Sequence, residues 1–168
     1  MPFQTFDLLG MGLKHADTET EERIRALEGV TAWYRYLLPF AVDALEAAFE
    51  GVDGGVVEIS RWYGDPADIE LFGRVKGLLS TFEFVVMTVP STDSDAAFEV
   101  LRSRWKTKID GVELNQHFAA HDSNRLLAKH VIYTKGKTPP QTRDEILAAI
   151  DKEAAPVILI GPMRAGKS

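Results

Sequence analysis

Short apolar runs that alternate with stretches of helical periodicity are the feature that most constrains how this chain can fold. Several of the runs are apolar at successive positions, as strands are when helices cover both faces of a sheet. The alternation predicts an α/β domain with a mainly parallel sheet. The expected strands are rich in β-branched and aromatic residues and lie at Phe3–Asp7, Gly55–Ser60, Phe82–Val89, His130–Thr134 and Pro156–Ile160.

The segments between these runs have helical periodicity. Thr142, followed three residues later by Glu145, has the form of a capping box, and we expect Pro139–Pro140 to stop any earlier helix. Pro39 lies inside the longest helical pattern and predicts a kink or break near Leu38. The expected helices are Thr20–Leu27, Thr31–Phe49, Ala67–Leu79, Asp95–Lys106, Ser123–Lys129 and Thr142–Glu153.

Length and charge narrow the class of protein. The 168 residues fit one domain spanning 1–168, and the absence of cysteine excludes disulfides, thiolate metal sites and a cysteine nucleophile. With 19 Lys+Arg against 25 Asp+Glu, the net charge of -6 argues against nucleic acid or an anionic membrane as the main partner. No apolar run reaches the roughly 20 residues of a membrane span, and the N-terminus lacks a signal-peptide layout. We therefore expect a cytoplasmic protein.

The strongest chemical signal follows the last apolar run, where GPMRAGKS completes a G-x-x-x-x-G-K-[ST] phosphate loop at 161–168. The glycines of such a loop let several backbone N–H groups point at a phosphate. Lys167 would reach the β- and γ-phosphates of ATP, and the Ser168 hydroxyl would bind Mg²⁺. The residues expected to hold the nucleotide are Gly161, Met163, Arg164, Ala165, Gly166, Lys167 and Ser168.

A phosphate loop normally continues into a helix whose N-terminal dipole helps to hold the phosphates. The printed sequence stops at Ser168, without that helix. A terminal carboxylate at Ser168 would oppose phosphate and metal binding.

Taken with the loop first, the chain resembles a small P-loop kinase of the shikimate-kinase-like group over nearly its whole length. ILIGPMRAGKS is similar to the group's first strand and loop. PFQTFD is similar to its next strand, which ends in D-x-D, with Thr5 in place of the first acid and Asp7 as the second. FEFVVMTVPSTDSDAAFEVLRSRW resembles the strand, helix and arginine-bearing lid entry, and SNRLLAKHVIYTKGKTPPQTRDEILAAI resembles the group's C-terminal part.

The resemblance implies a three-layer P-loop kinase-like domain with a five-stranded, mainly parallel sheet of order 2-3-1-4-5. The first strand and P-loop are moved to the C-terminus, as in a circular permutant, which puts the last strand in the middle of the sheet. Two explanations stay open: a permuted chain with a deletion, or a piece of a longer or tandem chain.

The resemblance also implies an activity, ATP-dependent phosphoryl transfer to a hydroxyl of a small metabolite with Mg²⁺ bound. Lys167 and Arg104 would stabilise the transferring phosphoryl group, and Asp7 would hold or deprotonate the acceptor hydroxyl. Arg102 would lie on the nucleotide-base side, and 107–122 would form a lid. The substrate is not expected to be shikimate, because Glu58–Trp62 replaces the group's substrate-contacting glycine run.

Other candidates have two readings each. Glu58 is either a base or substrate contact or a solvent-facing edge residue, and Arg125 is either phosphate-facing or a surface residue. The loop 134–138 either covers the adenine or is a polar turn. His117 and His121 have helical spacing but lack a third ligand for zinc. The aromatic residues expected to pack in the core, or to line the acceptor pocket, are Trp33, Tyr34, Tyr36 and Phe40.

Two other function classes are open to a chain with this loop. One is a non-catalytic nucleotide-binding or interaction domain whose P-loop site is incomplete. The other is a nucleotide hydrolase, which needs a water-positioning acid that Phe84–Val89 lacks. The sequence indicates neither the acceptor nor the oligomeric state.

Overall fold

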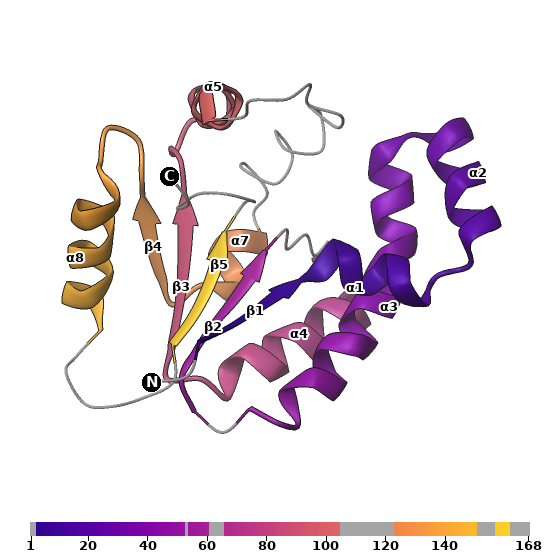
Figure 1. Ribbon diagram of the computed structural model, residues 1–168, viewed down its shortest axis with the longest axis horizontal. Helices are drawn as coiled ribbons and strands as arrows, with labels where there is room; N and C mark the ends of the chain where they lie inside the picture. The colour runs from indigo at the N-terminus through magenta and orange to yellow at the C-terminus, as the bar shows by residue number, and fades with distance from the viewer. Residues whose placement is uncertain (1–2, 53, 61–65, 105–122, 151–156, 162–168) are drawn as a thin grey trace.

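The computed structural model describes residues 3–52, 54–60, 66–104, 123–150 and 157–161 (Figure 1). The predicted mixed α/β class is confirmed, because helices and strands alternate along the chain. In order, the elements are β1 (Phe3–Asp7), α1 (Leu8–His15), α2 (Thr18–Glu28), α3 (Val30–Phe49), β2 (Val56–Ser60), α4 (Ile69–Ser80), β3 (Phe84–Val89), α5 (Ser94–Arg104), α7 (Ser123–Leu127), β4 (His130–Tyr133), α8 (Pro139–Ala149) and β5 (Val157–Gly161).

The strands form one sheet of order β1-β2-β5-β3-β4 in which every neighbouring pair is parallel. The strand latest in the chain, β5, lies at the centre. It pairs with β2 on one side, with Ser60 opposite Gly161, and with β3 on the other, with Met87 opposite Ile160. Among the described strands, the first strand, β1, is an edge strand that pairs with β2 alone.

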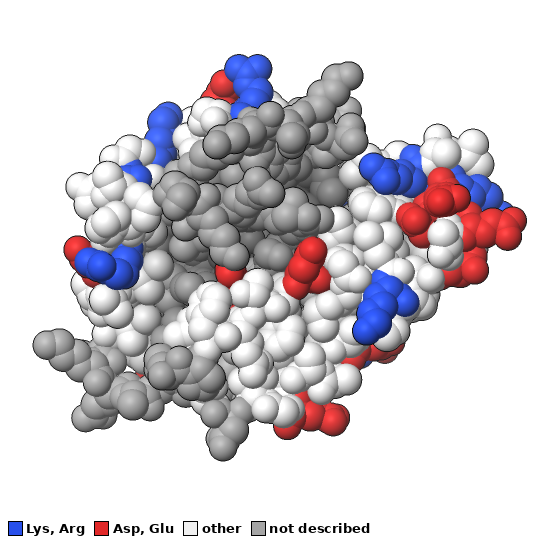
Figure 2. Space-filling view, viewed as in Figure 1, with Lys and Arg blue, Asp and Glu red and all other residues white. Residues whose placement is uncertain are grey.

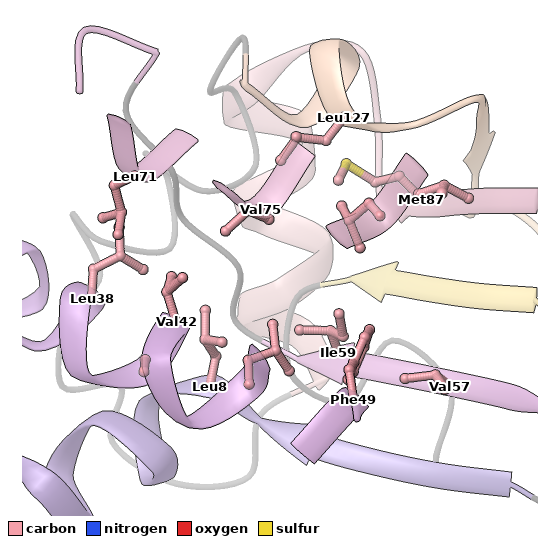
Figure 3. Close-up of a cluster of buried hydrophobic side chains, with 14 of the residues drawn as sticks. Leu8, Leu38, Val42, Phe49, Val57, Ile59, Leu71, Val75, Met87 and Leu127 are labelled. Atoms are coloured by element: carbon pink, nitrogen blue, oxygen red, sulfur yellow. The ribbon is translucent and has the colours of Figure 1, made fainter. Parts of the chain in front are cut away.

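The larger hydrophobic core lies between one face of this sheet and helices α1, α3, α4 and α7 (Figure 3). The strands contribute alternate residues, as the two-residue period of a strand requires. Side chains from β2 and β3 that face this core are Val57, Ile59, Val85, Met87 and Val89. The helices contribute Leu8, Leu37, Val42, Leu45, Leu71, Val75, Leu79 and Leu127, among others.

A smaller core occupies part of the opposite face. Phe84, Val86 and Ile132 are buried there, and Ile146 and Ile150, from α8 and its C-cap, pack against them. Among the described helices, α8 is therefore the one that covers this face, and it does so over β3 and β4.

Helix α1 packs closely against α3 at Gly12. A β-carbon at Gly12 would lie 2.8 Å from the carbonyl oxygen of Leu37 and 3.1 Å from the Leu37 β-carbon. Real β-carbons essentially never approach backbone oxygen so closely. Only glycine at this position therefore lets α1 pack this closely against α3.

An ion cluster joins α3 to α4 on the surface of the larger core. The Arg74 guanidinium donates to Glu46 through Nε at 3.0 Å and Nη2 at 2.6 Å, and Nη2 also donates to Asp43 at 2.6 Å. These hydrogen bonds from Arg74 to Glu46 and Asp43 raise the pKa of Arg74 above its usual range. The two-point contact with Glu46 fixes the relative rotation of the two helices.

Helix α1 is absent from the sequence-based prediction. Its sequence, LLGMGLKH, carries two glycines within eight residues, which lowers its intrinsic helix propensity. Packing against α3 offsets that loss, since Leu8 and Gly12 are buried there.

The predicted start of the last helix is also wrong. The capping box is formed by Thr138 and Gln141, not by Thr142 and Glu145, and α8 begins at Pro139. Pro139–Pro140 therefore belongs to the first turn of the helix, where a missing N–H removes no helical hydrogen bond. The helix ends at Ala149, short of the predicted Glu153.

Pro39 does not break its helix, because α3 continues from Val30 to Phe49 with this proline inside it.

Trp33 and Tyr34 are buried in the larger core as predicted. Tyr36 packs against this core, and its ring meets the edge of the Phe40 ring with 5.5 Å between the ring centroids. Core packing therefore accounts for most of this aromatic group.

The glycines of α1 and α4 give a matched test of the α1–α3 contact. Gly12→Ala should lower the free energy of unfolding by about 1–3 kcal/mol, because its methyl group would clash with Leu37. Gly73→Ala should raise it by about 0.5–1 kcal/mol, because Gly73 lies exposed in α4 with nothing within 4 Å of an added β-carbon. Urea denaturation of both variants measures the difference, and a Gly12→Ala protein as stable as Gly73→Ala would contradict the proposed contact.

Candidate functional site

The candidate site lies at the carboxyl edge of the parallel sheet, where open α/β sheets bind ligands. Asp7, Ser60 and Gly161 end three neighbouring strands and stand opposite one another in the register. Adjacent strands are about 4.8 Å apart, so the backbone of Asp7 lies roughly 10 Å from that of Gly161. Gly161 is also the first residue of the GPMRAGKS motif. The other residues of this motif, 162–168, which include Lys167 and Ser168, lie outside the described residues.

Asp7 occupies the N-cap position of α1 but makes no side-chain capping hydrogen bond to it. Its side chain is exposed at the sheet edge and lies against Gly10, where an added β-carbon would stand 3.2 Å from Asp7 Oδ2. The absence of a side chain at Gly10 leaves the space that this carboxylate occupies. The site prediction did not include Gly10, because its importance depends on the undetected helix α1.

Glu58 provides a second carboxylate, farther from the carboxyl edge of the sheet than Asp7. Thr5 and Glu58 are register partners on β1 and β2, and the Thr5 hydroxyl donates a hydrogen bond to Glu58 Oε2 at 3.3 Å. Both are two residues before their strand ends, about 7 Å from the edge, and by strand alternation on the same face as Asp7. Glu58 is half-buried. It is thus neither a fully exposed edge residue nor an isolated buried charge.

The loop after β4 forms a turn at the same edge. The Thr134 N–H donates to the Val89 carbonyl and the Lys135 N–H to the Pro90 carbonyl, both at 2.9 Å. Gly136 has a φ of 76°, which glycine adopts readily, and the Lys137 N–H donates to the Thr134 carbonyl. The Thr134 hydroxyl is buried and has no hydrogen-bond partner among the described residues. The loop is a defined polar turn, and its contact with a nucleotide stays a prediction.

The arginines proposed for the site lie on two helices, with Arg102 and Arg104 on α5 and Arg125 on α7. Arg102 is exposed on α5 and pairs with Glu99, with Nη2 at 2.8 Å from Oε2. Arg104 is the last residue of α5. Arg125 is exposed on α7, a helix of five residues. The predicted lid 107–122, with His117 and His121, lies outside the described residues.

Within the residues that the structure describes, no group of three or more histidine, aspartate or glutamate side chains is placed to hold a metal ion. No helix there is both long enough and apolar enough to cross a membrane.

Comparisons of the chain with models of protein families, with curated proteins and with solved structures gave no match in any of the three.

Proposed function

We propose that this chain transfers the γ-phosphoryl group of ATP to a hydroxyl of a small metabolite with Mg²⁺ bound. The observation that carries the proposal is the place of the phosphate-loop motif. It begins at Gly161, the end of the central strand β5, two strands from Asp7 at the same edge. A nucleotide bound by the motif and an acceptor beside Asp7 would therefore lie within one site.

The order of the sheet supports the family resemblance that motivates this function. The phosphate-loop strand lies between β2 and β3, and the strand ending in Asp7 lies beyond β2. This is the order 2-3-1-4-5 when β5 is counted first. We therefore propose a P-loop kinase-like domain in circularly permuted order, a finer assignment than the α/β class alone.

In this proposal the protein positions the reactants and stabilises charge, as expected for phosphoryl transfer. The backbone N–H groups of Gly161, Met163, Arg164, Ala165 and Gly166, together with the Lys167 ammonium, would hold the phosphates. The bond from the γ-phosphorus to its bridging oxygen breaks as the acceptor oxygen bonds to the γ-phosphorus. Asp7 accepts the proton of the acceptor hydroxyl, and Arg104 stabilises the charge that develops on the transferring group.

In the proposed site, oxygen atoms would hold Mg²⁺, which prefers oxygen ligands. Thr5 stands where the resembled family has an acid, so β1 supplies one carboxylate there instead of two. Glu58 brings a carboxylate to the Thr5 position from the neighbouring strand, since the two side chains are hydrogen-bonded. We propose that Glu58 takes over the support of Mg²⁺, directly or through water, with the Ser168 hydroxyl as a ligand.

The alternative function is nucleotide binding without catalysis. Two observations favour it: the residue at position 5 is not an acid, and the guanidinium of Arg102 already pairs with Glu99. The two functions differ in one result, because both bind ATP but only the kinase yields a phosphorylated acceptor.

Removal of the loop lysine tests the phosphate site. Lys167→Ala should weaken the binding of ATP and ADP in Mg²⁺ by at least about tenfold, because it removes the cation that meets the phosphates. Isothermal titration calorimetry measures this, with Lys76→Ala on the exposed face of α4 as the control. Equal affinities in both variants, or no binding by the folded wild-type protein, would contradict the proposal.

Substitution at Glu58 tests the metal side separately. Glu58→Gln keeps the size of the side chain and an oxygen that can accept from Thr5, but removes the negative charge. We expect the Mg²⁺ concentration needed for half-maximal ADP binding to rise by about tenfold, with Mg²⁺-free ADP binding unchanged. The control is Glu83→Gln, an exposed residue just before β3 at the opposite edge of the sheet. The same Mg²⁺ dependence in both variants would exclude a metal role for Glu58.

A further inference from the structure

Helix α2 lies at one end of the molecule, beyond α3 and away from the sheet (Figure 1). Figure 2, in the same view, shows acidic and basic side chains gathered over this end. None of the 11 residues of α2 is buried, although α1 and α3, the helices that it connects, both contribute side chains to the larger core. A helix that buries so little apolar surface gains little stability from packing. We therefore expect α2 to open more easily than its two neighbours.

Trp33, in the first turn of α3, attaches α2 to α3. The Trp33 side chain is 6% exposed, and its indole N–H donates a hydrogen bond to the Glu21 carboxylate of α2. The Arg25 guanidinium, one helical turn after Glu21, lies over the Trp33 ring, with its central carbon 4.9 Å from the ring centroid. Ile24 of α2 packs against the larger core. These contacts, most of which involve one aromatic ring, hold α2 against α3.

Gly29 is the single residue between α2 and α3. Its φ of 87° and ψ of 178° place it in a backbone region that is essentially restricted to glycine. A β-carbon added there would have nothing within 4 Å, so the requirement for glycine comes from the backbone and not from packing. At the other end, Ala16 and Asp17 link α1 to α2 in extended backbone. Helix α2 is therefore bounded on both sides by short non-helical connections at which its orientation can change.

We propose that α2 is a hinged flap, which detaches from α3 about Gly29 and the 16–17 connection while the sheet, α1 and α3 stay folded. The closed position covers the Trp33 ring, and the open position exposes it to solvent. Helix α1 does not move with the flap, because it is packed closely against α3 at Gly12. The flap is a two-state element, and any ligand that binds the exposed Trp33 ring shifts it toward the open position. The proposal concerns α2 alone and does not rest on the proposed function.

Native-state hydrogen exchange of the whole chain tests this proposal. Once detached, a helix of 11 residues is too short to keep its own hydrogen bonds, so the α2 amides exchange whenever the flap opens. We expect them to exchange at least about 100-fold faster than the amides of residues 37–45 in α3, but slower than in an unstructured peptide. Urea below the unfolding transition should leave the α2 rates nearly unchanged, because opening exposes little new surface, and should accelerate exchange in α3. Equal protection and equal urea dependence in both helices, or α2 exchange at the rate of an unstructured peptide, would overturn the proposal.

A matched pair of substitutions tests the contact that holds the flap closed. Glu21→Ala removes the acceptor of the Trp33 indole N–H, whereas Glu22→Ala makes the same change of residue at the neighbouring, exposed position of α2. The α2 amides should exchange about fivefold faster in Glu21→Ala than in Glu22→Ala. Equal rates in the two variants would contradict the attachment at Trp33 and with it the proposal.

A second pair of variants tests the hinge. Gly29→Ala removes no contact but disfavours the backbone of the closed position, so the α2 amides should exchange about tenfold faster. Gly73→Ala should stabilise α4 and slow exchange in the core, but leave the α2 rates unchanged, because α4 stays folded when the flap opens. No acceleration by Gly29→Ala would overturn the proposal. So would α2 amides that Gly73→Ala slows as strongly as those of α3, because α2 would then open only when the whole domain unfolds.

Discussion

The pairing of β5 on both of its sides is the constraint on which the rest of the structure depends. Without it, β1–β2 and β3–β4 would be two separate strand pairs, because within the described residues no other strand bridges them. The backbone groups of β2 and β3 that face β5 would then need other partners, and an unpaired buried backbone group is costly. The strand that completes the sheet is also the strand that leads into the phosphate-loop motif, so fold and candidate site share one element.

The close packing of α1 on α3 shapes the part of the candidate site that contains Asp7. Gly12 allows α1 to lie against Leu37, and Gly10 leaves space for the Asp7 carboxylate at the start of the same helix. Two glycines that weaken the helix in isolation therefore have separate structural uses. One permits the packing of α1, and the other keeps the end of β1 open at the edge where a ligand would bind.

The sequence predicts strands better than helix ends or contacts. Apolar runs located each strand that the structure describes, and burial accounts for the run at β3, where five of the six residues are buried. The bounds of Phe3–Asp7 match β1 at both ends although this edge strand is largely exposed. Helix α1 was missed because its stability comes from a tertiary contact at Gly12, and the start of α8 was misplaced because two prolines fit its first turn. The Thr5–Glu58 hydrogen bond depends on the register of β1 against β2, which alternation within one strand does not determine.

Hydrogen exchange of the β5 amides tests the central place of this strand most directly. The account predicts that amides of Val157–Gly161 exchange as slowly as those of Phe84–Val89 in β3, since both strands would open only with the whole sheet. Exchange in β5 at the rate of an unstructured peptide, while β3 stays protected, would contradict it. The motif would then no longer be held between Asp7 and β3, and the proposed site would lose its geometric basis.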